Sequence, residues 1–180
     1  MKEGYLLKRK TEHGVVSPQE LEKINQYTRR EFQAQELYTF SVVLCDNQVD
    51  RDFECFTKAA LEKLKELFLG KTGIFDHSMR SGGQTARIYD CRVETLPERK
   101  NQLGEPYSRL VARAYLPRTA KNQDFITELD SGIKKEVSGE PSALLHLRRG
   151  PEEGSLPPSE GENLRRQAVL HCAGRSLRRV

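Results

Sequence analysis

The amino-acid composition of this chain changes abruptly after Ser138. All thirteen aromatic residues (seven Phe and six Tyr) precede that position, and residues 139–180 contain no Phe, Tyr, Ile, Lys or Asp. The same 42 residues contain seven Arg, five Glu and four Pro, and their only β-branched residues are Val169 and Val180. A folded segment normally builds its core from aromatic and β-branched side chains. We therefore expect residues 139–180 to be a tail without a core of its own.

Two explanations of this tail remain open. It is either a natural, Arg-rich disordered tail or the product of a truncated or frameshifted coding sequence, because Arg without Lys is typical of G/C-rich DNA read out of frame. Residues 150–162 have the composition of a linker. The runs Ala143–Leu147 and Gln167–His171 are expected to form helical turns at most.

Bulk properties bound the classes of function. The 138 residues before the break suit one domain, and their 23 basic and 21 acidic side chains give a net charge of only +2. No basic stripe argues for a nucleic-acid partner. No apolar run reaches the roughly 20 residues of a membrane span, and the first residues lack a secretory signal. We therefore expect neither a nucleic-acid nor a membrane partner.

The four cysteines are not spaced as a metal site or a disulfide framework. They are Cys45, Cys55, Cys91 and Cys172, with no CxxC pair among them. Reduced thiols in a cytoplasm are the expected state, and we predict neither a metal nor a cofactor.

Apolar periodicity predicts an α+β fold around a mostly antiparallel sheet or barrel. Ser17-Pro18-Gln19-Glu20 is typical of a capped helix start, and we predict a helix or helical arm from there to about Gln35. The other predicted elements are a strand at Leu37–Leu44, a helix at Lys58–Leu69 capped by Thr57 and ended by Gly70, strands at Arg87–Val93 and Leu110–Leu116, a helix at about Ala120–Ser131 capped by Thr119, and a strand entered at Lys134–Ser138. Alternation assigns Tyr38, Phe40, Val42 and Leu44 to one face of the first strand, and helical spacing makes Leu61, Leu64, Leu67 and Phe68 the apolar stripe of the Lys58–Leu69 helix. The predicted organisation is an N-terminal helical arm (1–36), a core domain (37–138) and the tail (139–180).

Two residues are candidates for chemistry. His77 follows the strand-like Gly73-Ile74-Phe75 and opens a Gly- and Ser-rich loop, where an imidazole could act as a general base. A purely structural histidine explains the same pattern. Ser138 follows a helix stop at Gly132 and would need such a base to become a nucleophile. The two are 61 positions apart in the sequence, so only the fold can bring them together.

An acidic series invites a metal-binding interpretation but does not fit it. Asp46, Asp50, Asp52 and Glu54 lack the Gly and Glu positions of a calcium loop. An acidic turn that caps the chain and pairs with Arg51 is the favoured interpretation.

The order of several motifs resembles the prohead proteases of tailed bacteriophages, capsid-maturation serine proteases related in fold to the herpesvirus assemblins. The motifs are DNQVDRDFECF before a helix, GIFDHS, QTARIYDCRVE and GIKKEVS, and the resemblance runs from roughly Leu37 to Ser138. The resemblance implies a small, mostly antiparallel β-barrel flanked by helices, incomplete here at its C-terminus. It also implies that His77 is the base and Ser138 the nucleophile of a serine endopeptidase.

The same resemblance implies partners and a location. Members of the family cleave scaffold protein, or the N-terminal segment of the major capsid protein, within the immature procapsid in the bacterial cytoplasm. Family members continue past the serine into strands that carry a third catalytic residue, which the sequence of the tail does not identify. Whether this chain is active, and whether it forms a homodimer, therefore stays open.

Two alternatives to a protease remain. One is a non-catalytic capsid-assembly or scaffold protein that retains the protease-like core. The other is a nucleic-acid-binding module that uses the Arg-rich tail, which predicts binding that weakens with salt.

Overall fold

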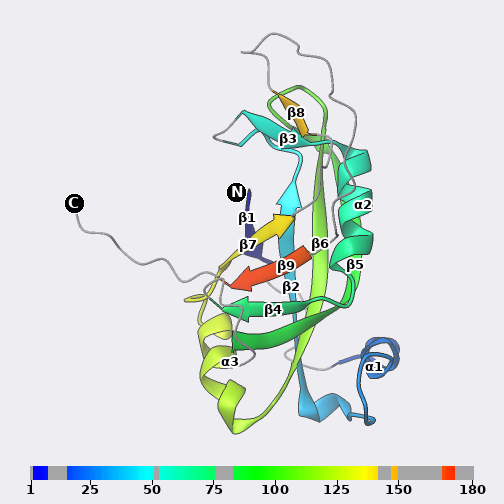
Figure 1. The fold of residues 1–180 in the computed structure, drawn as a ribbon, viewed down its shortest axis with the longest axis vertical. Coiled ribbons are helices and arrows are strands. Elements are labelled where there is room, and N and C mark those ends of the chain that lie inside the picture. Colours follow the sequence, from blue (N-terminus) through cyan, green and yellow to red (C-terminus); the bar gives the residue numbers. More distant parts are fainter. Residues whose placement is uncertain are drawn as a thin grey trace, which may run out of the picture.

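The computed structural model describes residues 2–7, 16–50, 53–75, 83–141, 147–149 and 168–172 (Figure 1). The α-helices of this part are α1 (Pro18–Asn25), α2 (Lys58–Phe68) and α3 (Gln123–Asp130), with short 3-10 turns η1 (Ala34–Glu36) and η3 (Ala120–Asn122). Its strands are β1 (Lys2–Leu6), β2 (Leu37–Asp46), β3 (Glu54–Phe56), β4 (Thr72–Phe75), β5 (Gln84–Lys100), β6 (Pro106–Pro117), β7 (Glu136–Pro141), β8 (Leu147–Arg149) and β9 (Ala168–Cys172).

Most of the described strands belong to one sheet. Its order of paired strands is β1-β2-β6-β5-β4-β9-β7, and β7 also pairs with β1. The pairings are antiparallel except that of β4 with β9. Strands β3 and β8 form a separate antiparallel pair. The fold is therefore α+β with a mostly antiparallel sheet, which confirms the class predicted from the sequence.

Strand β2 shows why alternation predicted this part of the fold well. Tyr38, Phe40, Val42 and Leu44 all belong to the larger buried core cluster, on the face that the alternation assigned to them. Leu37, one position out of phase, belongs to a second cluster instead. Side chains of a strand alternate between the two faces of a sheet, so the two clusters occupy opposite sides.

Helix α2 covers the larger core. The Thr57 side chain caps it by accepting a hydrogen bond from the Ala60 amide at 3.1 Å, as the sequence predicted. Leu61, Leu64 and Phe68 are buried within the core cluster, and α2 lies alongside β5 and β6 (Figure 1). The apolar stripe read from the sequence is thus the packed face.

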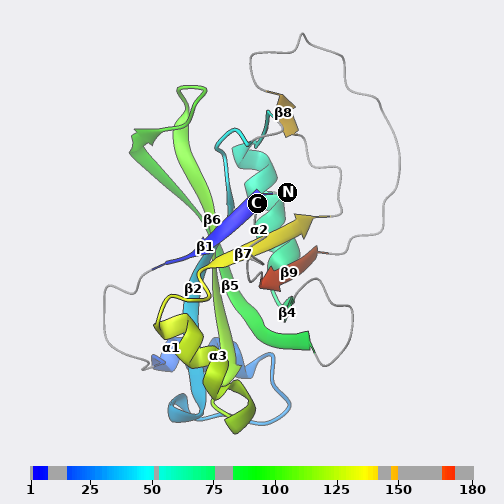
Figure 2. The ribbon, with the colours of Figure 1, turned by 90° about the vertical axis from the view of Figure 1, so that its left-hand side faces the viewer.

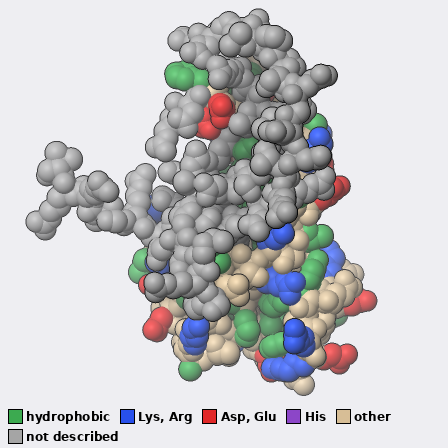
Figure 3. Space-filling view, viewed as in Figure 1, with side chains coloured by type: hydrophobic (Ala, Val, Ile, Leu, Met, Phe, Trp, Pro, Cys, Tyr) green, Lys and Arg blue, Asp and Glu red, His purple; other side chains and the backbone are tan. Residues whose placement is uncertain are grey.

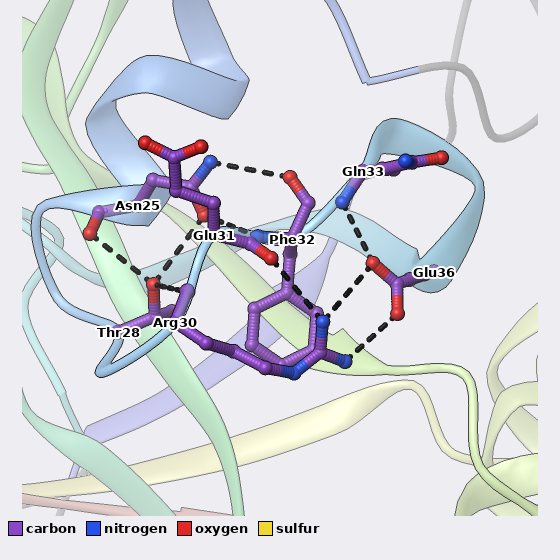
Figure 4. A network of polar contacts seen from close by, with 7 residues as sticks. All are labelled: Asn25, Thr28, Arg30, Glu31, Phe32, Gln33 and Glu36. Carbon is purple, nitrogen blue, oxygen red and sulfur yellow. Dashed lines mark hydrogen bonds and ion pairs between the residues drawn. The ribbon is translucent and has the colours of Figure 1, made fainter.

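Helix α1 ends at Asn25 and is therefore shorter than predicted, since the predicted helix ran to about Gln35. The Asn25 side chain accepts a hydrogen bond from the Phe32 amide at 3.0 Å and donates to the Phe32 carbonyl at 3.2 Å. Thr28 donates to the Arg30 carbonyl at 2.6 Å, and Arg30 pairs with Glu36 (Figure 4). Asn and Thr side chains compete with helical hydrogen bonds in this way, and the chain turns back.

Strands were missed at both ends of the described chain. Residues 2–6 form β1, within the segment predicted to be a helical arm. Within the tail, Ala168–His171 of the run predicted as helical turns at Gln167–His171 belongs to β9, and Leu147, the last residue of the predicted run Ala143–Leu147, begins β8. Ala143–His146 and Gln167 lie outside the described residues. Strand β9 has almost no local strand signal, and it pairs with β4 and β7 on its two sides. Tertiary pairing therefore overrides local composition here.

The third helix and the hairpin also differ from prediction in detail. The predicted helix at Ala120–Ser131 is split into η3 and α3, and Thr119 makes no capping hydrogen bond with its side chain. Strands β5 and β6 are longer than predicted, and their paired ends continue beyond β2 as a hairpin that projects from the sheet (Figure 2).

Candidate functional site

The strand of Ser138 begins at a tightly built turn. Helix α3 ends in a Schellman motif: the Gly132 amide donates to the Leu129 carbonyl at 3.2 Å, and the Ile133 amide donates to the Glu128 carbonyl at 3.0 Å. Gly132 has a φ of 74°, which glycine adopts without strain. The chain then enters β7, and the buried Val137 anchors it in the core. The predicted strand at Ser138 is confirmed, although it begins two residues later, at Glu136.

Strand β7 has a neighbour on each side at Ser138. The Ser138 backbone is the register partner of Glu3 in β1 and of His171 in β9. Strand β9 in turn pairs with β4, where Ile74 is the register partner of His171. Ile74, His171 and Ser138 therefore lie at one level of the sheet. Their strands β4, β9 and β7 are adjacent (Figure 2).

His77 lies outside the described residues, two positions after the end of β4 at Phe75. The strand-like end predicted before it is confirmed as β4. Adjacent strands lie about 4.8 Å apart, so Ile74 and Ser138 are separated by roughly 10 Å of sheet. An extended residue spans at most about 3.5 Å. The structure therefore brings the strand that leads to His77 to within one strand of Ser138.

His171, at the same level of the sheet, is a residue to which the sequence assigned no role. Its strand could not be read from a composition that lacks alternation, so no sequence signal pointed to it. Its backbone position between β4 and β7 follows from pairing alone.

A cluster of polar side chains joins α1 to the sheet. The Glu20 carboxylate accepts a hydrogen bond from the Tyr89 hydroxyl at 2.7 Å and forms an ion pair with Arg113. Arg113 also donates to the Tyr89 hydroxyl at 3.1 Å and to the Ser41 hydroxyl at 3.0 Å. Burial opposes ionisation of Glu20, but the bonds from Tyr89 and Arg113 outweigh it and lower its pKa to about 2. Burial, followed by the bond to Glu20, raises the pKa of Tyr89.

The role of this cluster is structural: it holds helix α1 on the sheet and exposes no reactive group. Its members satisfy one another, and Glu20 also closes the predicted capping box with Ser17. The sequence predicted that capping role correctly. It gave no sign of the ion pair, because Arg113 is 93 positions away from Glu20.

The acidic series forms local turns. Asp46 accepts hydrogen bonds from the Gln48 amide at 3.0 Å and the Tyr107 hydroxyl at 2.8 Å. Asp50 accepts one from the Glu54 amide at 3.0 Å, as a capping turn requires. The predicted partner Arg51, with Asp52, lies outside the described residues. Within the described ranges, no group of three or more His, Cys, Asp or Glu side chains could hold a metal ion.

Two buried amides brace the projecting hairpin. Asn47 donates to the Pro106 carbonyl at 2.9 Å and accepts from the Ser108 amide at 2.8 Å. Asn101 donates to the Asn47 carbonyl at 3.1 Å and accepts from the Glu105 amide at 2.8 Å. These buried groups are paired with one another, so hydrogen bonds join the loop after β2 to the hairpin tip.

Comparisons of the chain with protein-family models, curated proteins and solved structures gave no match. In the part of the chain that the structure describes, no helix has the length and apolarity needed to cross a membrane.

Proposed function

We propose that this chain is a serine endopeptidase of the prohead-protease kind, with Ser138 as nucleophile and His77 as base. One observation carries the proposal: β4, which leads to His77, and β7, which contains Ser138, pair with the same strand β9. The strand that leads to His77 and the strand that contains Ser138 are thereby brought to one region of the sheet. A nucleophile and its base require this proximity.

The reaction would be acyl transfer. The Ser138 hydroxyl attacks the scissile carbonyl while His77 accepts its proton, and His77 then protonates the leaving amine. Water repeats the sequence on the acyl-enzyme and releases the product. This chemistry needs no metal or cofactor. The amides of Ser138 and Gly139 lie in a strand that pairs on both sides, so the donors to the oxyanion come from other groups.

A base of this kind needs a residue that orients it. His171 is the residue to test for that role, because its backbone lies between the two strands concerned. Loss of an orienting residue costs on the order of 10⁴ in rate.

The finer fold, the substrates and the location are part of the same proposal. The last strand in the sheet order, β7, pairs with the first, β1, and this pairing supports a small barrel of the assemblin kind. The substrates would be scaffold protein or the N-terminal segment of the major capsid protein, within the procapsid of an infected or lysogenic bacterium. Lys and Arg side chains are interspersed with acidic and apolar ones on the described part of the face in Figure 3, which gives the nucleic-acid alternative no added support.

Labelling with a fluorophosphonate tests the proposal. The probe is expected to modify Ser138, Ser138→Ala is expected to abolish labelling, and His77→Ala is expected to slow it by at least 10²-fold. Ser131→Ala is the matched control, since Ser131 is exposed, directly follows helix α3 and donates its hydroxyl to the Glu128 carbonyl. Labelling that survives Ser138→Ala contradicts the assignment. No labelling of the folded chain favours the non-catalytic capsid-assembly alternative.

A further inference from the structure

Strand β1 lies between β2 and β7 and packs so closely against them that no side chain fits at Gly4. Gly4 is buried and is the register partner of Val137. A Cβ atom added to Gly4 would overlap the carbonyl oxygen of Val43. It would also lie 2.7 Å from the Val137 Cγ2 and 2.9 Å from the Leu44 carbonyl oxygen. Real Cβ atoms essentially never approach other atoms below 3.0 Å, so any side chain there must displace something.

Strand β2 is the neighbour least able to yield. Val43 and Leu44 are 1 % exposed, and Val43 is the register partner of the fully buried Val111 in β6. Two of the three close atoms are backbone oxygens of this central strand. Interiors packed at crystal-like density transmit such strain instead of absorbing it. The displacement is therefore taken up by β1 and β7.

Displacement of β1 and β7 reaches Ser138 directly. Val137, which meets the added Cβ, precedes Ser138 in β7. Glu3, the neighbour of Gly4, is the register partner of Ser138. Both routes lead from the Gly4 position to the backbone of the candidate nucleophile through a single residue.

We propose that Gly4 is a positioning residue for Ser138: the close approach that it allows between β1 and β2 fixes where β7 places the serine. The catalytic consequence rests on the proposed function, whereas the placement of β7 does not. Gly4 contacts neither substrate nor reacting atoms in this proposal. A misplacement of about 1 Å costs on the order of 10²-fold in rate, so small shifts of β7 are measurable.

The test compares Gly4→Ala with Gly104→Ala. Gly104 has a φ of 77°, where alanine is strained, but nothing lies within 4 Å of an added Cβ. It belongs to the hairpin tip, so its substitution destabilises the fold without displacing β7. Two quantities are measured in the full chain: amide hydrogen exchange along β7 and β6, and the fluorophosphonate labelling of Ser138 resolved into the inactivation rate and the probe affinity.

The expected result is local. In Gly4→Ala, exchange at Val137–Gly139 rises more than tenfold relative to exchange at Val111 and Ala112, and the inactivation rate falls about 10–100-fold while probe affinity is unchanged. In Gly104→Ala, neither the β7 pattern nor the inactivation rate changes. Uniform exchange in Gly4→Ala, unchanged exchange, or a loss confined to probe affinity overturns the proposal.

A milder variant keeps the test decisive if Gly4→Ala does not fold. Tyr5→Ala removes a half-exposed side chain of β1 that accepts a hydrogen bond from Arg109 at 3.3 Å. Tyr5 is also the register partner of Glu136, next to Val137 in β7, so loosening β1 here is expected to give the same β7-specific pattern at smaller amplitude. Uniform exchange overturns the proposal here too. If the wild-type chain is not labelled, the protease proposal is refuted. If Gly4→Ala still shows the β7-specific exchange pattern in that case, Gly4 remains the residue that places β7.

Discussion

The carboxylate of Glu20 and the guanidinium of Arg113 form an ion pair that fastens helix α1 to strand β6. Both side chains are largely shielded from solvent, and the Tyr89 hydroxyl bonds to each of them. Helix α1 spans only eight residues, too few for a helix that is stable by itself. The ion pair and the small apolar cluster beneath α1 therefore hold the helix in place.

Glu20→Gln is expected to lower the free energy of unfolding by about 2 kcal/mol, because Arg113 loses its charged partner while partly buried. Urea unfolding followed by circular dichroism measures the change. Lys23→Gln is the control, since the Lys23–Asp90 pair is 3.4 Å apart and solvent-exposed. Its effect is expected to stay below about 0.5 kcal/mol. Equal losses in the two variants would show that the ion pair is not what secures α1.

The contribution of Glu20 is expected to disappear in acid. Folding lowers the Glu20 pKa from 4.5 to about 2, so the folded state stabilises the ionised form. This contribution is fully present above pH 4.5 and is lost as the pH falls toward 2. The stability difference between wild type and Glu20→Gln should therefore shrink between pH 5 and pH 3, measured by urea unfolding at each pH. A difference that does not vary over this range contradicts the assignment.

Asn47→Ala is expected to cost about 3 kcal/mol of unfolding free energy, because the Ser108 amide and the Pro106 carbonyl lose their buried partner. Gln102→Ala, in the hairpin to which Asn47 bonds, is the matched control. Gln102 is exposed and bonds the Val49 backbone, so its loss should cost less than about 1 kcal/mol. Thermal unfolding separates the two variants, and a similar shift in both would refute the bracing role of Asn47.

Leu64→Ala is expected to destabilise the fold by about 2–5 kcal/mol, because it opens a cavity where α2 packs on the sheet. Leu69 follows the end of the same helix and is 44 % exposed. Leu69→Ala should cost less than about 1 kcal/mol. Equilibrium urea unfolding at pH 7 gives both values, and equal costs would mean that α2 does not cover the core as described.

Cys91 is expected to resist alkylation in the native protein. Burial, reinforced by the charge of Asp90, raises the pKa of its thiol to about 12, so almost no thiolate exists at pH 8. Mass spectrometry after brief iodoacetamide treatment should find Cys91 unmodified in buffer and modified in urea. Rapid native modification of Cys91 would contradict the raised pKa of this partly buried thiol.

Local signals account for the elements that were predicted correctly. Tyr38 to Leu44 alternate strictly, and Thr57 and Gly70 mark the ends of α2, so neighbours in sequence sufficed. Helix α1 was overextended because the Asn25 side chain bonds to Phe32 seven positions away. Strand β9 was missed because its conformation depends on β4 and β7, which are distant in the chain.

The sequence by itself determined the α+β class, the core faces of β2 and α2, and the two candidate residues His77 and Ser138. Periodicity, capping and motif order can be read from the sequence without knowledge of the fold. Only the tertiary structure decided that β4 and β7 share β9, that Glu20 meets Arg113, and that β1 passes Val43 at Gly4. Those contacts join residues far apart in the chain, and their energies depend on packing that no short stretch of sequence encodes.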